Sequence, residues 1–191
     1  FSFSIPAYVV NNEAVNAIDD ANDNTILEDS VDETLNTQID EKDSQTLTED
    51  GEQTNSDGTF KEFETILWRA SDGDTIVLDR DYYYDGDARN VMGVYKQLTI
   101  DGAGHTLDGK NGARIFYMDS TTKKVTLMNI NFVNAKINGA GGAILNDGAQ
   151  LTVINCTFTN NRITGTTGGA IACNNVNNVV IKDCTFTNNY A

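Results

Sequence analysis

The chain has 191 residues, with 28 acidic and 13 basic side chains and a formal net charge of -15 at pH 7. This length allows one domain with a core, or a smaller domain and a tail. The negative charge argues against nucleic acid as a partner, because phosphate binding needs a basic surface. No apolar run approaches the roughly 18 residues of a membrane-spanning helix, so this fragment has no predicted transmembrane segment.

The first residues differ in character from the rest of the chain. They begin without Met, are apolar at the start, and place small side chains at Val15 and Ala17, in the spacing that signal peptidase prefers. We interpret residues 1–17 as the remnant of a secretion signal, with an ordinary disordered terminus as the alternative. The first interpretation predicts an exported protein that acts outside the cell.

A strongly acidic stretch comes next. Between Asn11 and Gly58 there are 15 acidic residues and one basic residue, Lys42, so these residues carry -14 of the net charge. The stretch has no aromatic side chain, and its scattered apolar residues cannot offset the entropy lost on ordering. We predict that residues 18–57 are an acidic, disordered linker. The remaining sequence, from Thr59 onward, is nearly neutral, and we expect the folded domain there.

A helix is predicted at residues 58–73. Its apolar side chains recur at helical spacing, at Phe60, Phe63, Leu67 and Ala70. We expect Ser56 or Asp57 to be the N-cap and Gly73 to end the helix.

Short strand patterns come after the helix. Residues 74–86, "DTIVLDRDYYYDG", are predicted to open a first coil of strands. Residues 98–109, "LTIDGAGHTLDG", read as two very short strands with Asp-Gly turns, and residues 114–119, "RIFYMD", as another strand.

The rest of the sequence repeats itself. Residues 125–144, 151–171 and 179–189 align as "VTLMNINFVNAKINGAGGAI", "LTVINCTFTNNRITGTTGGAI" and "VVIKDCTFTNN". The aligned columns step by 26 and then by 28 residues, and the Gly pair steps by 27. Such a period indicates a solenoid.

The repeat unit predicts the fold. Apolar and polar residues alternate, β-branched residues are common, and no unit leaves room for a crossover helix. About 27 residues at roughly 3.3 Å each close one turn of a three-sided coil. We therefore predict an all-β, right-handed parallel β-helix at residues 74–191, with about four coils. The helix at residues 58–73 would cap its N-terminal end. Because the sequence stops within a unit, we expect further coils beyond it.

Each column then has a structural role. Phe132, Phe158 and Phe186 should stack in the interior, beside an aliphatic column of Ile130, Cys156 and Cys184. The cysteines, which include Cys173, form no CxxC motif. Parallel in-register positions suit the torsions of a disulfide between Cys156 and Cys184 poorly, so we expect free, buried thiols there. Two aligned columns should hold bends, and the amides of their Asn residues should bond to the coils above and below; the columns are Asn129, Asn155 and Asp183, and Asn134, Asn160 and Asn188. Gly142 and Gly169 should mark a bend with positive φ or close backbone approach.

These motifs carry a family resemblance. The paired "GGAI" and "FxxN" tetrapeptides at residues 141–144 with 158–161, and at residues 168–171 with 186–189, resemble the repeats of chlamydial polymorphic membrane proteins. The whole layout resembles the adhesin-like surface proteins of methanogenic archaea. The first unit departs from the pattern, because it reads "FVNA" at residues 132–135. The resemblance implies a pectin-lyase-like β-helix at the cell surface that attaches to glycans or other cells, and it implies no particular ligand.

An enzyme is the main alternative, because β-helices of this class include pectate lyases and polygalacturonases. Their chemistry needs grouped carboxylates, as acid and base or as calcium ligands. From residue 119 onward the acidic residues are few and separated, at Asp119, Asp147 and Asp183. The single His105 lacks a partner nucleophile at a telling spacing, so we expect a structural or solvent-facing role.

Two further candidates have a structural alternative. Asp79, Asp81, Asp85 and Asp87 could form a calcium loop, but they lack the EF-hand order and fit ordinary turns. Tyr82, Tyr83 and Tyr84 could offer a platform to a sugar, or one or two rings could pack under the helix. Lys123 and Lys124 fit a solvated turn.

We predict no catalytic, cofactor-binding or metal site, and we favour a non-catalytic adhesin-like module over an enzyme or a cell-envelope spacer.

Overall fold

The computed structural model describes residues 8–10, 58–86, 89–165, 167–176 and 178–191. The linker predicted at residues 18–57 lies outside the described residues, and so does most of the predicted secretion-signal remnant. Three of the first 17 residues form strand β1 (Tyr8–Val10), which pairs antiparallel with β3 (Thr75–Val77).

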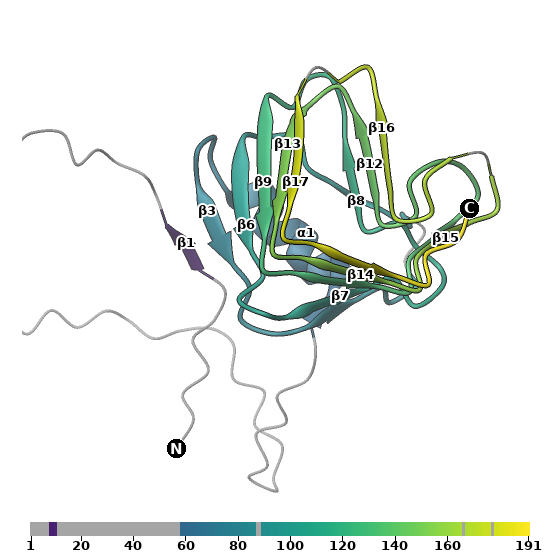
Figure 1. The fold of residues 1–191 in the computed structure, drawn as a ribbon. Helices are drawn as coiled ribbons and strands as arrows, with labels where there is room; N and C mark the ends of the chain where they lie inside the picture. The colour runs from purple at the N-terminus through teal and green to yellow at the C-terminus, as the bar shows by residue number, and fades with distance from the viewer. Residues whose placement is uncertain (1–7, 11–57, 87–88, 166, 177) are drawn as a thin grey trace, which may run out of the picture. The chain divides into compact units, whose positions relative to one another are not determined.

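The described residues form a parallel β-helix with three long sheets, one two-stranded sheet and about five turns, one turn more than the sequence predicts (Figure 1). The first sheet has the order β1, β3, β6 (Leu98–Asp101), β9 (Lys124–Met128), β13 (Gln150–Ile154) and β17 (Val179–Lys182). The second has the order β2 (Gly58–Thr59), β4 (Tyr82–Tyr83), β7 (Thr106–Asp108), β10 (Asn131–Val133), β14 (Thr157–Thr159) and β18 (Thr185–Thr187). The third has the order β5 (Met92–Gly93), β8 (Phe116–Met118), β12 (Ile144–Asp147) and β16 (Ile171–Asn174). The strands β11 (Lys136–Ile137) and β15 (Arg162–Ile163) pair at the corner between the second and third sheets.

The pairing register follows the sequence repeat. Phe132 pairs with Phe158, and Phe158 with Phe186. Their rings stack with centroids 4.7 and 4.8 Å apart and nearly parallel planes, at 7° and 5°. The predicted aromatic column is therefore confirmed, and it continues toward the helix through Phe116 and Phe63.

The cysteines are free, as predicted, but of the two expected to be buried only Cys156 is fully so. Ile130 and Cys156 are buried on successive coils, and Cys184 follows them in a half-buried position. All three cysteines are free thiols, with Cys156 buried and Cys173 exposed.

The bends use the predicted residue types. All six aligned Asn and Asp positions have φ between 50° and 57°, the left-handed conformation that Asn and Asp tolerate better than most side chains. The two roles predicted at the glycine bend, positive φ and close backbone approach, fall on two neighbouring residues. Gly141 has φ +66°, whereas a Cβ on Gly142 would lie 2.0 Å from the carbonyl oxygen of Gly169 on the next coil. Close backbone approach, and not positive φ, therefore requires the glycine at Gly142.

The helix α1 (Phe60–Arg69) closes the N-terminal end, as the sequence predicts, but its ends differ from the prediction. The N-cap is Thr59, whose hydroxyl accepts from the Glu62 backbone N–H while the Glu62 carboxylate accepts from the Thr59 N–H. The predicted caps, Ser56 and Asp57, lie outside the described residues. The helix ends at Arg69, four residues before Gly73, because Ala70 is already extended, at φ -62° and ψ 152°.

Strand β2 explains why the helix starts later than predicted. Gly58 and Thr59 pair in parallel with Tyr82 and Tyr83, so the second sheet begins before the helix. The buried side of α1 then presents Phe63 to the Tyr82 ring, with centroids 5.0 Å apart. Helix and solenoid thus share one core.

Candidate functional site

A polar groove of about 400 Å³ lies at the corner between the first and second sheets. It crosses three coils and is lined by Asp101, Ala103, Gly104, Asn129, Asn131, Asn155 and Thr157. Its side chains come from the ends of first-sheet strands, from the bends, and from the starts of second-sheet strands. Since coils stack in register, equivalent positions repeat along the groove.

Two rows of hydrogen bonds form the walls of this groove. In the first row, Asn155 Nδ2 donates to Asn129 Oδ1 at 2.8 Å, and Asn129 Nδ2 donates to Asp101 Oδ1 at 2.9 Å. In the second row, Thr157 Oγ1 donates to Asn131 Oδ1 at 2.8 Å, and Asn131 Nδ2 donates to the carbonyl of Gly104 at 2.7 Å. The amide hydrogen bond predicted for the Asn129 column is confirmed between Asn129 and Asn155, whereas the second row was not predicted.

These rows leave hydrogen-bonding capacity for a ligand. A side-chain amide has two N–H donors and an oxygen with two lone pairs. The two rows use one donor and one oxygen lone pair of Asn129 and of Asn131. Asn129 and Asn131, which line the groove, therefore each keep one N–H donor and one oxygen lone pair, and a sugar hydroxyl, which both donates and accepts, matches such groups.

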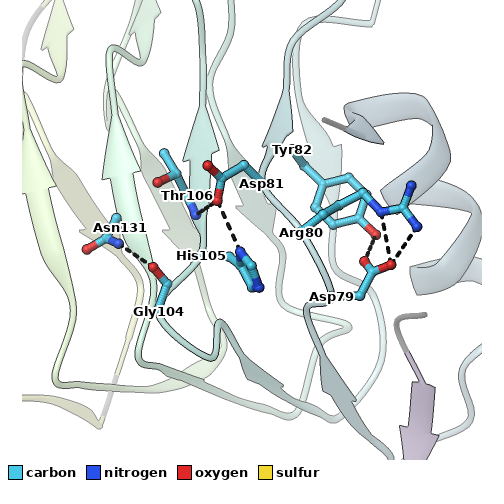
Figure 2. Close-up of polar contacts among 8 residues, drawn as sticks. All are labelled: Asp79, Arg80, Asp81, Tyr82, Gly104, His105, Thr106 and Asn131. Carbon is cyan, nitrogen blue, oxygen red and sulfur yellow. Dashed lines mark hydrogen bonds and ion pairs between the residues drawn. The ribbon is translucent and has the colours of Figure 1, made fainter. Parts of the chain in front are cut away.

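His105 follows Gly104 at one end of this groove. Its Nδ1 lies 3.2 Å from Asp81 Oδ1, and the same carboxylate oxygen accepts from the Thr106 backbone N–H at 2.8 Å (Figure 2). Both side chains of the His105 and Asp81 pair are partly exposed. The structural role that the sequence predicts for His105 fits this contact, which joins two successive coils.

Two aspartates of the alternative calcium loop, Asp79 and Asp81, have separate partners. Asp79 accepts from the Arg80 guanidinium and from the Tyr82 hydroxyl, the latter at 2.7 Å, away from Asp81 (Figure 2). Burial and the Asp79 hydrogen bond raise the pKa of Tyr82. Asp87 lies outside the described residues.

The acidic residues of the repeats are also held apart. Asp119 accepts from the Thr121 hydroxyl, which lowers the pKa of Asp119. Asp147 accepts from Asn175 Nδ2 at 2.8 Å, and Asp183 pairs with Lys182 at 3.7 Å. Among the described residues, no three His, Cys, Asp or Glu side chains converge as a metal site.

The exposed aromatic rings are not those of the tyrosine run. Tyr82 is buried against Phe63, and Tyr84 lies 6.3 Å from Phe60, so two rings pack under the helix as in the structural alternative. Tyr83 faces outward with the Lys110 ammonium 5.4 Å from its ring centre.

Two exposed rings lie at the cap. Trp68 is 65% exposed and Tyr95 is 50% exposed, and both line a small apolar depression with Leu67 and Leu98. The helical spacing of the sequence could have identified Trp68 as exposed, because Trp68 falls outside the buried stripe of Phe60, Phe63 and Leu67. Nothing in the local sequence marks Tyr95.

None of the described residues belongs to a helix with the length and apolar character needed to cross a membrane. Comparison of the chain with family models, with curated proteins and with solved structures gives no match.

Proposed function

We propose that this β-helix is a non-catalytic, adhesin-like module that is exported, displayed at the cell surface and attached through its polar groove to a glycan. One observation carries the proposal: a groove across three coils is lined with amide, hydroxyl and carbonyl groups that keep free hydrogen-bonding capacity. A repeating row of such groups suits a polymer with repeating hydroxyls.

The geometry also supports binding over cleavage. Glycoside cleavage by two carboxylates requires them to flank one bond, at roughly 5–10 Å from each other. Asp101 is the single acidic residue among those lining the groove, and its Oδ1 already accepts from Asn129 and from the Ala103 N–H. The exposed Trp68 and Tyr95 add amphipathic rings at the cap that suit the apolar faces of sugars.

The test changes the groove without changing the bends. The double variant Asn131→Ala/Thr157→Ala removes the second row of hydrogen bonds, whereas the matched control Thr126→Ala/Thr152→Ala changes paired outward residues of the first sheet. Binding of both variants to an array of neutral glycans is compared with that of the unchanged protein, with circular dichroism as the check of folding. We expect the groove variant alone to lose binding.

Other outcomes favour the alternatives. Release of unsaturated or reducing sugars from polygalacturonate by the unchanged protein would show a carbohydrate-active enzyme and contradict a non-catalytic module. Folded protein that binds no glycan on the array would favour a cell-envelope spacer.

A further inference from the structure

Three basic residues form a column on successive coils. Lys136 pairs with Arg162 through β11 and β15, and the Arg162 backbone N–H donates to the carbonyl of Ala135 at 2.8 Å. The Lys136 N–H donates in the same way to Ala113, at 2.9 Å. This pattern places Arg114 one coil before Lys136, so the three cations follow one another at about 4.8 Å, the spacing of parallel strands. We call these three residues the basic column.

The basic column faces outward. In each coil the residues before and after the cation turn into the core. Ala113 and Ile115 are fully buried around Arg114, and Asn161 and Ile163 are buried around Arg162. In the coil between them Ala135 is buried and Ile137 half-buried. Strand alternation therefore turns the side chains of the basic column away from the core, where Arg162 is exposed and Arg114 and Lys136 are half-buried.

The column is not neutralised within the described part of the chain. None of the ion pairs found among the described residues involves Arg114, Lys136 or Arg162. Like charges placed opposite each other on neighbouring strands repel. Arg114 donates to the carbonyls of Ala140 and Gly141, at 2.8 and 3.0 Å, which holds its guanidinium against the neighbouring loop. Lys136 and Arg162 keep their charged groups available to a ligand.

An exposed aromatic residue extends the column. Tyr190 forms a parallel bridge with Arg162, one coil further on, and is 71% exposed. Its backbone N–H donates to the carbonyl of Asn161 at 2.9 Å, which fixes its place in the row. Three cations and an aromatic ring thus lie in one line along the axis of the solenoid.

We propose that the basic column binds an acidic polysaccharide, with carboxylate or sulfate groups at Lys136 and Arg162 and a sugar ring against Tyr190. This inference rests on the proposed glycan-binding function and adds a charge class and a second site to it. An Arg guanidinium forms paired hydrogen bonds with carboxylate or sulfate, and Lys adds a point charge. A polymer with one anionic group in each repeat matches cations that repeat once in each coil. The basic column lies at the corner between the second and third sheets, away from the polar groove at the other corner of the second sheet.

Alginate tests this inference, because every sugar unit of this polymer carries a carboxylate. The Kd of the 191-residue protein for alginate is measured by calorimetry at several salt concentrations, beside alginate whose carboxylates have been reduced to alcohols, dextran sulfate and double-stranded DNA. We expect alginate or dextran sulfate, but not the reduced polymer, to bind, with affinity that falls as salt rises. Which of the two binds more tightly identifies carboxylate or sulfate as the preferred group.

Two double variants distinguish the effect of the basic column on binding from the effect of net charge alone. Lys136→Gln/Arg162→Gln should weaken binding of the anionic polymer about fivefold to tenfold, as expected for two charge contacts at the surface, and should reduce the salt dependence of binding. Lys123→Gln/Lys124→Gln removes the same charge from another surface and should leave the affinity for the polymer and its salt dependence unchanged. Arg114 is kept, because its hydrogen bonds hold the loop.

The results that test the basic column differ from those that test the polar groove. Equal weakening in both double variants, equal binding of the reduced polymer, or equally tight binding of DNA would overturn the basic column as a polysaccharide site. Retention of neutral glycans by the Lys136→Gln/Arg162→Gln variant would show that the polar groove functions independently. Loss of neutral glycan binding in the groove variant alone would leave the basic column unaffected.

Discussion

The side-chain amide of Asn161 donates a hydrogen bond to the backbone carbonyl of Phe132, one coil earlier, at 3.0 Å. Its Oδ1 accepts from the Ala135 N–H at 2.9 Å, so one buried side chain satisfies two backbone groups of the preceding coil. Asn189 repeats the arrangement on the last coil, bonding to the carbonyl of Phe158 and to the N–H of Asn161.

The first unit lacks this final Asn of "FxxN", and Ala135 takes its place. A Cβ on the facing Gly109 would lie 2.7 Å from the Ala135 Cα. The close approach of the two backbones therefore requires glycine at residue 109.

Asn161→Ala should lower the free energy of unfolding by about 2–4 kcal/mol, because it leaves buried backbone groups of Phe132 and Ala135 without partners. Asn189→Ala, at the equivalent position of the last coil, should cost less, because Asn189 is only half-buried and water can take the place of its side chain. Urea unfolding followed by circular dichroism measures both. Similar losses for the two variants would contradict the assigned role of burial.

Gly142→Ala should be among the most destabilising changes to any glycine, by about 3 kcal/mol or more, because the added Cβ meets the Gly169 carbonyl oxygen on the next coil. Gly104→Ala is the matched control. It has φ +87° but open space around a new Cβ, so it should cost about 1–2 kcal/mol from backbone strain alone. Thermal unfolding of the two variants compares them, and a smaller loss for Gly142→Ala would be inconsistent with the close approach.

The stability should fall as pH rises above about 9. Burial raises the pKa of the Cys156 thiol from 9.0 to about 11. The folded state therefore keeps a proton that the unfolded state loses between these values, so its contribution, on the order of 2 kcal/mol, is present below pH 9 and lost by about pH 11. Unfolding free energies at pH 8, 9.5 and 11 test this. Cys156→Val should flatten the dependence, and an unchanged slope in that variant would assign it to another group.

The last coil should exchange its amide protons faster than the central coils. Strands β17 and β18 are paired on one side only among the described residues, and Phe186 is 48% exposed although it continues the buried stack of Phe158. Local opening at such an edge needs less free energy than global unfolding. Hydrogen exchange read by mass spectrometry should show fraying from residue 179 onward, and protection there equal to that of β9 and β13 would disprove it.

The repeat made the interior predictable from sequence, whereas the outer surface was not. Phe158, Cys156 and Asn155 could be placed because in-register stacking gives aligned residues the same environment. The N-cap of the helix could not be placed from sequence, because β2 has only two residues and therefore shows no periodicity. The pairing of β2 with β4 extends the chain as far as Thr59, so that the helix begins directly after it. The polar groove depends on how Asn131 and Thr157 meet across coils, which is a property of the fold and not of either residue.

The number of residues between paired strands shows where successive coils gain extra residues. Paired residues are 26 apart between β11 and β15, 27 apart between β12 and β16, and 28 apart between β13 and β17. One residue is thus gained at each of the two corners that flank β16, while the sheets on either side keep their register. Chain length and axial position are uncoupled at these corners, so peptides grafted there should be carried on the surface without shifting the Phe stack or the spacing of the basic column.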